Sequence, residues 1–149
     1  MKVMVIFKGS KASEAGDMGP PEVFAAMDKF NEELINAGIM LDGTGLAPTS
    51  RGARVRFSGS NRTVTAGPFA ETTEIIAGFC IWKVSSLQEA IDWVKKCPNP
   101  TNEESEIDIR PLMEPEDFAG LVPPERLEEV KALEAQSGDR DGYGLARFK

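Results

Sequence analysis

The side chains that could do chemistry stand in two places, just after residue 70 and near residue 108. Glu71 and Glu74 are three residues apart, so a helical segment would place both carboxylates on one side. Two crowded carboxylates in a cleft can share a proton, which creates a general acid or base. Asp108 is a third candidate for such chemistry. Because solvated loop acids are commoner than catalytic ones, we favour solvent exposure for Glu71 and Glu74.

The chain has 149 residues and no histidine, which excludes every chemistry that depends on an imidazole. A Ser/His/Asp or Cys/His nucleophile and a histidine-ligated zinc are therefore excluded. Cys80 and Cys97 do not form a CxxC pair, and we expect both to be packed thiols. The chain also lacks GxGxxG, Walker, HExxH and EF-hand motifs, so the sequence predicts neither a cofactor nor a metal site.

Gly67, Pro68 and Phe69 form a sharp break between two predicted strands. One hypothesis is a tight turn that exposes backbone amides and places Phe69 as one wall of a ligand pocket. The equally weighted alternative is a turn that a buried aromatic ring anchors. Trp82 belongs either to the core or interface, or to the far face of the sheet, where it would line a ligand cavity.

Four charged side chains are further candidates for ligand binding. Asp108 and Arg110 alternate with two isoleucines, so both point toward the second face of the predicted sheet. Such a pair either orients an anionic or hydrogen-bonding ligand or forms an interface ion pair. Lys8 and Asp42 stand at the ends of the first two predicted strands.

Hydrophobic periodicity predicts the elements that position these residues. Alternating apolar residues predict strands at residues 2–8, 39–46, 75–84 and 107–112, and a hairpin at residues 53–65. Helical spacing predicts a helix that begins at two prolines, residues 20 and 21, and ends before Gly38. A second helix begins with a capping box of Ser86 and Glu89. The order βαββαβ with an inserted β-hairpin predicts an α+β, ferredoxin-like fold.

The predicted strands at residues 2–8 and 75–84 are apolar on both faces. Two helices cover only one face of a four-stranded sheet, so something else must cover the second face. The same face of a second copy is the simplest candidate, because a two-fold axis buries a self-complementary patch. The alternative is a C-terminal helix that folds back, but one short helix offers too little area. We therefore expect a homodimer.

Composition predicts one domain at residues 1–113, followed by an acidic extension at residues 114–149. The extension contains nine acidic and five basic residues, and we expect a short amphipathic helix and a mobile end from residue 138 onward. The formal net charge of -7 argues against nucleic-acid binding. The sequence shows no membrane span and no signal peptide, so we expect a cytoplasmic protein that does not bind membranes.

Residues 43–70 carry four positive charges, Arg51, Arg54, Arg56 and Arg62, and no acidic residue. Such a patch either attracts an anionic ligand or acidic partner, or it is the exposed face of a hairpin. We favour the exposed face, because Arg54 and Arg56 alternate with Val55 and Phe57.

Four segments closely resemble the YCII-related family, in the branch called DGPF-domain proteins. They read KFNEELINAGIMLDGTGL at residues 29–46, VTAGPFAETTEIIAGFCIWKV at 64–84, SLQEAIDWVKKCPNP at 86–100 and EIDIRPL at 106–112. The resemblance implies a dimeric α+β barrel of ferredoxin-like subunits. Many DGPF proteins are encoded beside, or fused to, extracytoplasmic-function sigma factors, which implies a regulatory association. Related YCII proteins have been proposed to use a His and Asp pair, but this chain has no histidine and has Ala66 where the motif begins with Asp.

The leading hypothesis is a homodimer that binds a small molecule in the cleft between its sheets and serves a regulatory, sigma-factor-associated role. The first alternative is an enzyme that uses Glu71, Glu74 or Asp108 as acid or base on a small organic substrate. The second alternative is a protein-interaction module without a ligand, which acts through the acidic extension or the basic hairpin.

Overall fold

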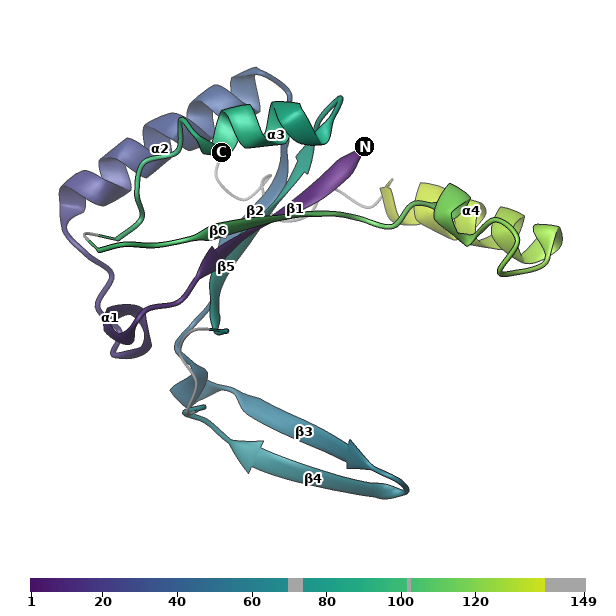
Figure 1. The fold of residues 1–149 in the computed structure, drawn as a ribbon, viewed down its shortest axis with the longest axis horizontal. Helices are drawn as coiled ribbons and strands as arrows, with labels where there is room; N and C mark the ends of the chain where they lie inside the picture. The colour runs from purple at the N-terminus through teal and green to yellow at the C-terminus, as the bar shows by residue number, and fades with distance from the viewer. Residues whose placement is uncertain (70–73, 102, 139–149) are drawn as a thin grey trace.

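A four-stranded antiparallel sheet forms the centre of the molecule (Figure 1). The computed structural model describes residues 1–69, 74–101 and 103–138. The strands follow the order β2-β5-β1-β6, and every neighbouring pair is antiparallel. Their bounds are Lys2–Lys8 for β1, Met40–Gly45 for β2, Ile76–Lys83 for β5 and Ile107–Pro111 for β6. This arrangement confirms the predicted α+β, ferredoxin-like fold.

Two helices, α2 (Pro21–Asn36) and α3 (Leu87–Val94), cover the same face of this sheet (Figure 1). A proline opens α2, where a missing N–H leaves no hydrogen bond unmade. Gly38 follows the end of α2 with a φ of 72°, a left-handed conformation that glycine adopts without strain. Both predicted ends of this helix are confirmed. In the described part of the chain, no helix combines the length and apolar character needed to cross a membrane.

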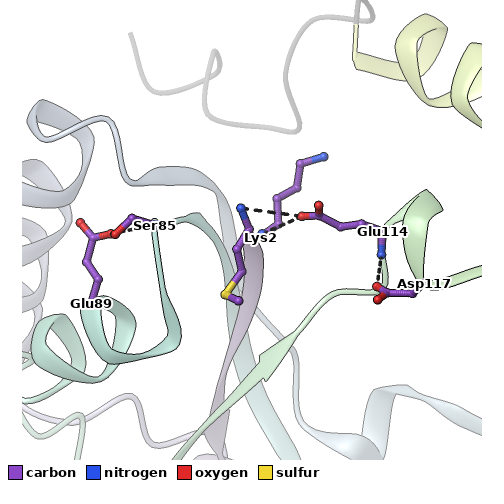
Figure 2. Close-up of polar contacts among 6 residues, drawn as sticks. Lys2, Ser85, Glu89, Glu114 and Asp117 are labelled. Atoms are coloured by element: carbon purple, nitrogen blue, oxygen red, sulfur yellow. Dashed lines mark hydrogen bonds and ion pairs between the residues drawn. The ribbon is translucent and has the colours of Figure 1, made fainter.

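The start of α3 differs in one detail from the predicted capping box. The Ser86 hydroxyl accepts a hydrogen bond from the Glu89 N–H at 3.1 Å, as predicted. The Glu89 carboxylate, however, accepts from the N–H of Ser85 at 2.6 Å and from its hydroxyl at 2.7 Å (Figure 2). The backbone N–H and the hydroxyl of Ser85 thus both donate to the same carboxylate oxygen of Glu89. The hydroxyl and backbone hydrogen bonds from Ser85 lower the pKa of Glu89.

The hydrophobic core lies between the sheet and the two helices. Val3 and Val5 of β1 and Leu34 of α2 are fully buried. Trp82 of β5 is 1% exposed, and its ring packs edge-on against Phe30 of α2 with the ring centroids 6.3 Å apart. Edge-to-face contacts of this kind add to the apolar burial that holds α2 on the sheet.

Trp82 lies in the core, and the alternative that places it on the far face of the sheet is wrong. Trp82 pairs with Val3 across β5 and β1, so both side chains point toward the helices. Alternation along a strand identifies the residues that share a face, but not the face that helices will cover. The indole nitrogen of Trp82 finds no hydrogen-bond partner among the described residues, so apolar packing holds this side chain.

The inserted hairpin is a separate two-stranded sheet that projects from the body of the molecule. β3 (Ala53–Ser58) pairs with β4 (Asn61–Ala66) along their full length. All residues of the two strands are exposed. Figure 1 shows the hairpin on the side of the four-stranded sheet that faces away from α2 and α3. The predicted hairpin is confirmed, and its arginines lie on an exposed element, as favoured.

The C-terminal extension is attached to β1 through Glu114. Its carboxylate accepts a hydrogen bond from the Lys2 N–H at 3.2 Å and lies 3.8 Å from the Met1 amino nitrogen (Figure 2). A short 3₁₀ turn, η2 (Pro115–Phe118), and α4 (Pro124–Gly138) follow, which confirms a helix in this segment. Figure 1 shows α4 running away from the sheet, so it does not fold back over the second face. The predicted mobile end lies outside the described residues from residue 139 onward.

Leu34→Ala should lower the free energy of unfolding by about 2–5 kcal/mol, because it leaves a cavity in the core. Ile35→Ala is the matched control, since Ile35 is 51% exposed. This control substitution should change the free energy of unfolding by less than about 1 kcal/mol. Urea denaturation followed by tryptophan fluorescence measures both values. Equal losses for the two variants would contradict the assignment of Leu34 to the core.

Candidate functional site

The second face of the sheet carries an apolar patch that no helix of the described residues covers. Cross-strand pairing places Met4 beside Ile81 and Ile6 beside Phe79, so these side chains are neighbours. All four are partly exposed, whereas the two valines that alternate with Met4 and Ile6 are fully buried. We call Met4, Ile6, Phe79 and Ile81 the open face.

A charged cluster lies at one end of the open face, beside the paired strands β1 and β6. Lys8 Nζ is 2.9 Å from Asp108 Oδ2 and 3.7 Å from Glu74 Oε2. The side chain of Lys8 is 20% exposed, against 77% for Glu74. The hydrogen bond with Asp108, together with the nearby negative charges, raises the pKa of Lys8 above its usual value. Lys8 is therefore a firmly held cation, and three predicted site residues meet at one point.

Asp42 and Arg110 lie apart from this cluster. Asp42 is on β2, at the opposite edge of the sheet from β6, and its carboxylate accepts from the Gly43 N–H at 2.8 Å. Arg110 pairs in register with Met4 and so borders the open face. Asp108 and Arg110 share this face as predicted, but Asp108 forms its ion pair with Lys8. The five charged candidates in the described part of the chain therefore do not converge on a single centre.

Glu71 falls within residues 70–73, outside the described part of the chain. The predicted pairing of its carboxylate with that of Glu74 stays a prediction. Glu74 itself stands just ahead of β5 and contacts Lys8 from there.

The turn at Gly67, Pro68 and Phe69 anchors the base of the hairpin. The Gly67 N–H donates to the Gly52 carbonyl at 3.0 Å, and the Phe69 N–H donates to Thr49 Oγ1 at 3.0 Å. Pro68 has no N–H to offer. The hypothesis that this turn exposes backbone amides is therefore wrong, because the loop before β3 supplies an acceptor for each of them.

Two further contacts fix this base. The Arg54 guanidinium lies over the Phe69 ring, with Cζ 4.1 Å from the ring centroid. The Glu14 carboxylate accepts hydrogen bonds from the Thr49 N–H at 3.1 Å and from the Thr49 hydroxyl. Glu14 ends the short helix α1 (Lys11–Glu14), so three distant segments meet here. Glu14 and Thr49 carry no signal in the sequence, because no local motif links residues 35 positions apart.

Gly67 approaches a neighbouring backbone segment so closely that no side chain fits. A Cβ atom at Gly67 would lie 1.6 Å from the Thr49 carbonyl oxygen. A Cβ atom at Gly52 would face the same oxygen at 3.5 Å, which is an ordinary van der Waals distance. Position 67 therefore requires glycine, because the hairpin base leaves no room for a side chain there.

The two cysteines are packed thiols, as predicted. Both pack against the core on the helix-covered side of the sheet. Burial raises the pKa of Cys80 to about 12 and that of Cys97 to about 11, so neither is a thiolate at neutral pH. A shallow depression lies beside Cys97, and its lining includes none of the predicted site residues: Val94, Cys97, Pro98, Asn99, Pro100, Ser105 and Ile107.

The sheet order, the two helices on one face and the hairpin between β2 and β5 define an α+β protein of ferredoxin-like fold. The chain belongs to the YCII-related family, whose domain model matches residues 1–114. It is also similar to an uncharacterized protein of Rhizobium meliloti (strain 1021), with 31% identity over 90 residues. The matched residues make up 60% of this chain and 73% of the relative. The family resemblance is thus confirmed, and the DGPF branch stays a prediction.

Gly67→Ala should disrupt the hairpin base, because the added methyl group cannot fit against Thr49. Gly52→Ala is the matched control, since it adds the same group near the same oxygen without a clash. Limited trypsin digestion, followed by mass spectrometry, should show cleavage at the hairpin arginines about fivefold faster in Gly67→Ala. Equal cleavage rates in the two variants would show that the base tolerates a side chain.

Cys80 and Cys97 should react slowly with iodoacetamide at pH 8, because the thiolate is the reactive form. With the pKa raised to about 12 and about 11, alkylation in the folded protein should be at least about a hundredfold slower than in denaturant. Native thiols keep their protons above pH 9 while unfolded ones lose them, so stability should fall as the pH rises from 9 toward 11. Peptide mapping measures the rates, and equal rates in both states would contradict burial of the thiols.

Proposed function

We propose that this protein is a homodimer that binds a small organic acid between the sheets of its two subunits. The observation behind the proposal is the open face, a partly exposed apolar patch on a sheet whose other face is already covered by α2 and α3. Contact of such a patch with water is unfavourable, and a second copy would remove it. α4 runs away from the sheet and leaves this face free (Figure 1).

Pairing of two open faces agrees with the assembly that the family resemblance implies, a dimeric α+β barrel. A two-fold axis brings the same patch of each subunit together, so an apolar patch meets an apolar patch. The charged cluster of Lys8, Glu74 and Asp108 lies at the end of the patch, not within it. The interface can therefore exclude water at its centre while keeping charged groups at its rim.

Lys8 gives the proposed site its preference for an acid. Asp108 holds the Lys8 ammonium at 2.9 Å, whereas Glu74 makes a longer contact of 3.7 Å from a side chain that is 77% exposed. A ligand carboxylate could replace Glu74 at little cost, since exposed ion pairs contribute less than about 1 kcal/mol. The body of the ligand would then lie on Ile6 and Phe79, which pair across the neighbouring strands. The site therefore fits a small acid with an apolar or aromatic body.

The alternative functions stay predictions. The enzyme alternative would use Glu71, Glu74 or Asp108 as acid or base. Glu74 and Asp108 both contact the Lys8 ammonium, the group that would pair with a ligand carboxylate, and this contact is why we place binding first. The sigma-factor association and the interaction module without a ligand are not needed to account for the open face.

Phe79→Glu should convert the dimer into a monomer, because it would bury a charge within the open face. Sedimentation equilibrium should show self-association weakened by at least about a hundredfold. In NMR titrations, the wild-type protein should bind benzoate, a small aromatic acid, more tightly than benzamide, its neutral analogue. Lys8→Met should remove the preference for benzoate, because the cation that pairs with the carboxylate is lost.

Two variants serve as matched controls. Phe79→Leu keeps an apolar side chain in the patch and should remain dimeric. Lys95→Met removes a cation at the end of α3, on the helix-covered side, and should bind benzoate as the wild type does. A monomeric wild-type protein would refute the interface. A dimer that binds neither probe, or that keeps its preference after Lys8→Met, would refute the acid-binding site.

A further inference from the structure

The β3–β4 hairpin presents one apolar face to solvent. The register places Val55 opposite Val64 on this face, and Phe57 lies beside them. Phe57 and Val64 are 69% and 67% exposed. Arg62 stacks on Phe57, with Cζ 4.4 Å from the ring centroid, but leaves most of the ring uncovered. An isolated two-stranded hairpin is marginally stable in water, so packing of this apolar face against a partner would stabilise the hairpin.

The opposite face of the hairpin is already engaged at its base. Arg54 lies on that face and stacks on Phe69 of the same subunit. The hydrogen bonds of Gly67 and Phe69 to the loop before β3 fix the direction in which the hairpin leaves the body. Figure 1 shows that this direction leads to the side of the sheet that carries the open face. A second copy on the open face would therefore lie beside the hairpin.

Charge also favours a second copy as the partner. Residues 43–70 contain four arginines and no acidic residue. The rest of the chain contains all 24 acidic residues and the other 13 of the 17 basic ones, a net charge of -11. The hairpin is thus a basic element on an acidic protein, and the acidic body of another subunit complements it in charge.

We infer that the β3–β4 hairpin is an arm that packs against the second copy of this chain through Val55, Phe57 and Val64. Arg62 lies on the same face of the hairpin as these three residues, so it then meets the acidic body of the partner and orients the contact. This inference rests on the homodimer proposed above. It adds a second attachment to that dimer, outside the paired sheets, and gives the hairpin a packing surface that its own subunit lacks.

The test removes the apolar character of the arm and keeps its strand preference. The triple variant Val55→Thr, Phe57→Thr, Val64→Thr places β-branched residues at all three positions, so the hairpin register should persist. Sedimentation equilibrium should show dimerisation at least about tenfold weaker than in the wild type. The double variant Thr63→Ser, Thr65→Ser changes the opposite face of the same hairpin and should dimerise as the wild type does.

Trypsin digestion provides a second measurement that needs no hairpin variant. Cleavage after Arg56 and Arg62 in the wild type should slow as the protein concentration rises through the dissociation constant, because the dimer covers the arm. In the monomeric Phe79→Glu variant, cleavage should be fast at every concentration. A triple variant that dimerises as tightly as the wild type, or cleavage independent of concentration in a dimeric wild type, would overturn the arm and leave the homodimer intact. A wild type that is monomeric at all concentrations would overturn both.

Discussion

Two helices can cover one face of a four-stranded sheet, and in this chain α2 and α3 lie on the same face. The central strands β1 and β5 are nevertheless apolar on both faces, so apolar side chains on the second face stay in partial contact with water. The remaining described parts of the molecule leave this face open. α4 leaves the sheet, the hairpin departs on the uncovered side, and the cluster around Lys8 lies at the end of the apolar patch.

The element order could be predicted because local patterns have direct physical causes. Side chains in a strand alternate between faces, so period-two alternation predicts β1 and β5. A proline at the first turn and Gly38 after the last predict the ends of α2. The face that the helices cover could not be predicted, because alternation sorts the residues of a strand into two sets without indicating which set lies under the helices. For this reason the strand that contains Trp82 is predicted correctly, whereas the sequence leaves two alternatives for the face on which Trp82 lies.

The individual residues of the candidate site could be predicted from the sequence, but not which of them lie in contact. Lys8 and Asp108 are both expected candidates, but their contact exists because β1 pairs with β6 in a register that sets Ile6 opposite Asp108. The motif that contains Gly67 is recognisable from residue types, whereas its structural role depends on Thr49, which belongs to another segment. A sequence motif therefore identifies residues whose type matters. Whether they matter for chemistry or for packing depends on which distant residues they contact, and the long-range strand register determines those contacts.

The tip of the hairpin differs from its base in a way that suits protein engineering. Gly59, in the turn between β3 and β4, has a φ of 57°, and a Cβ atom at this position would have no neighbour within 4 Å. Local hydrogen bonds hold the turn: the Arg62 guanidinium donates to the carbonyl oxygens of Gly59 and Asn61, both at 2.9 Å. A fluorophore or a short epitope inserted at Ser60 would sit far from the core and the charged cluster, and it would report on the surroundings of the hairpin without altering the fold.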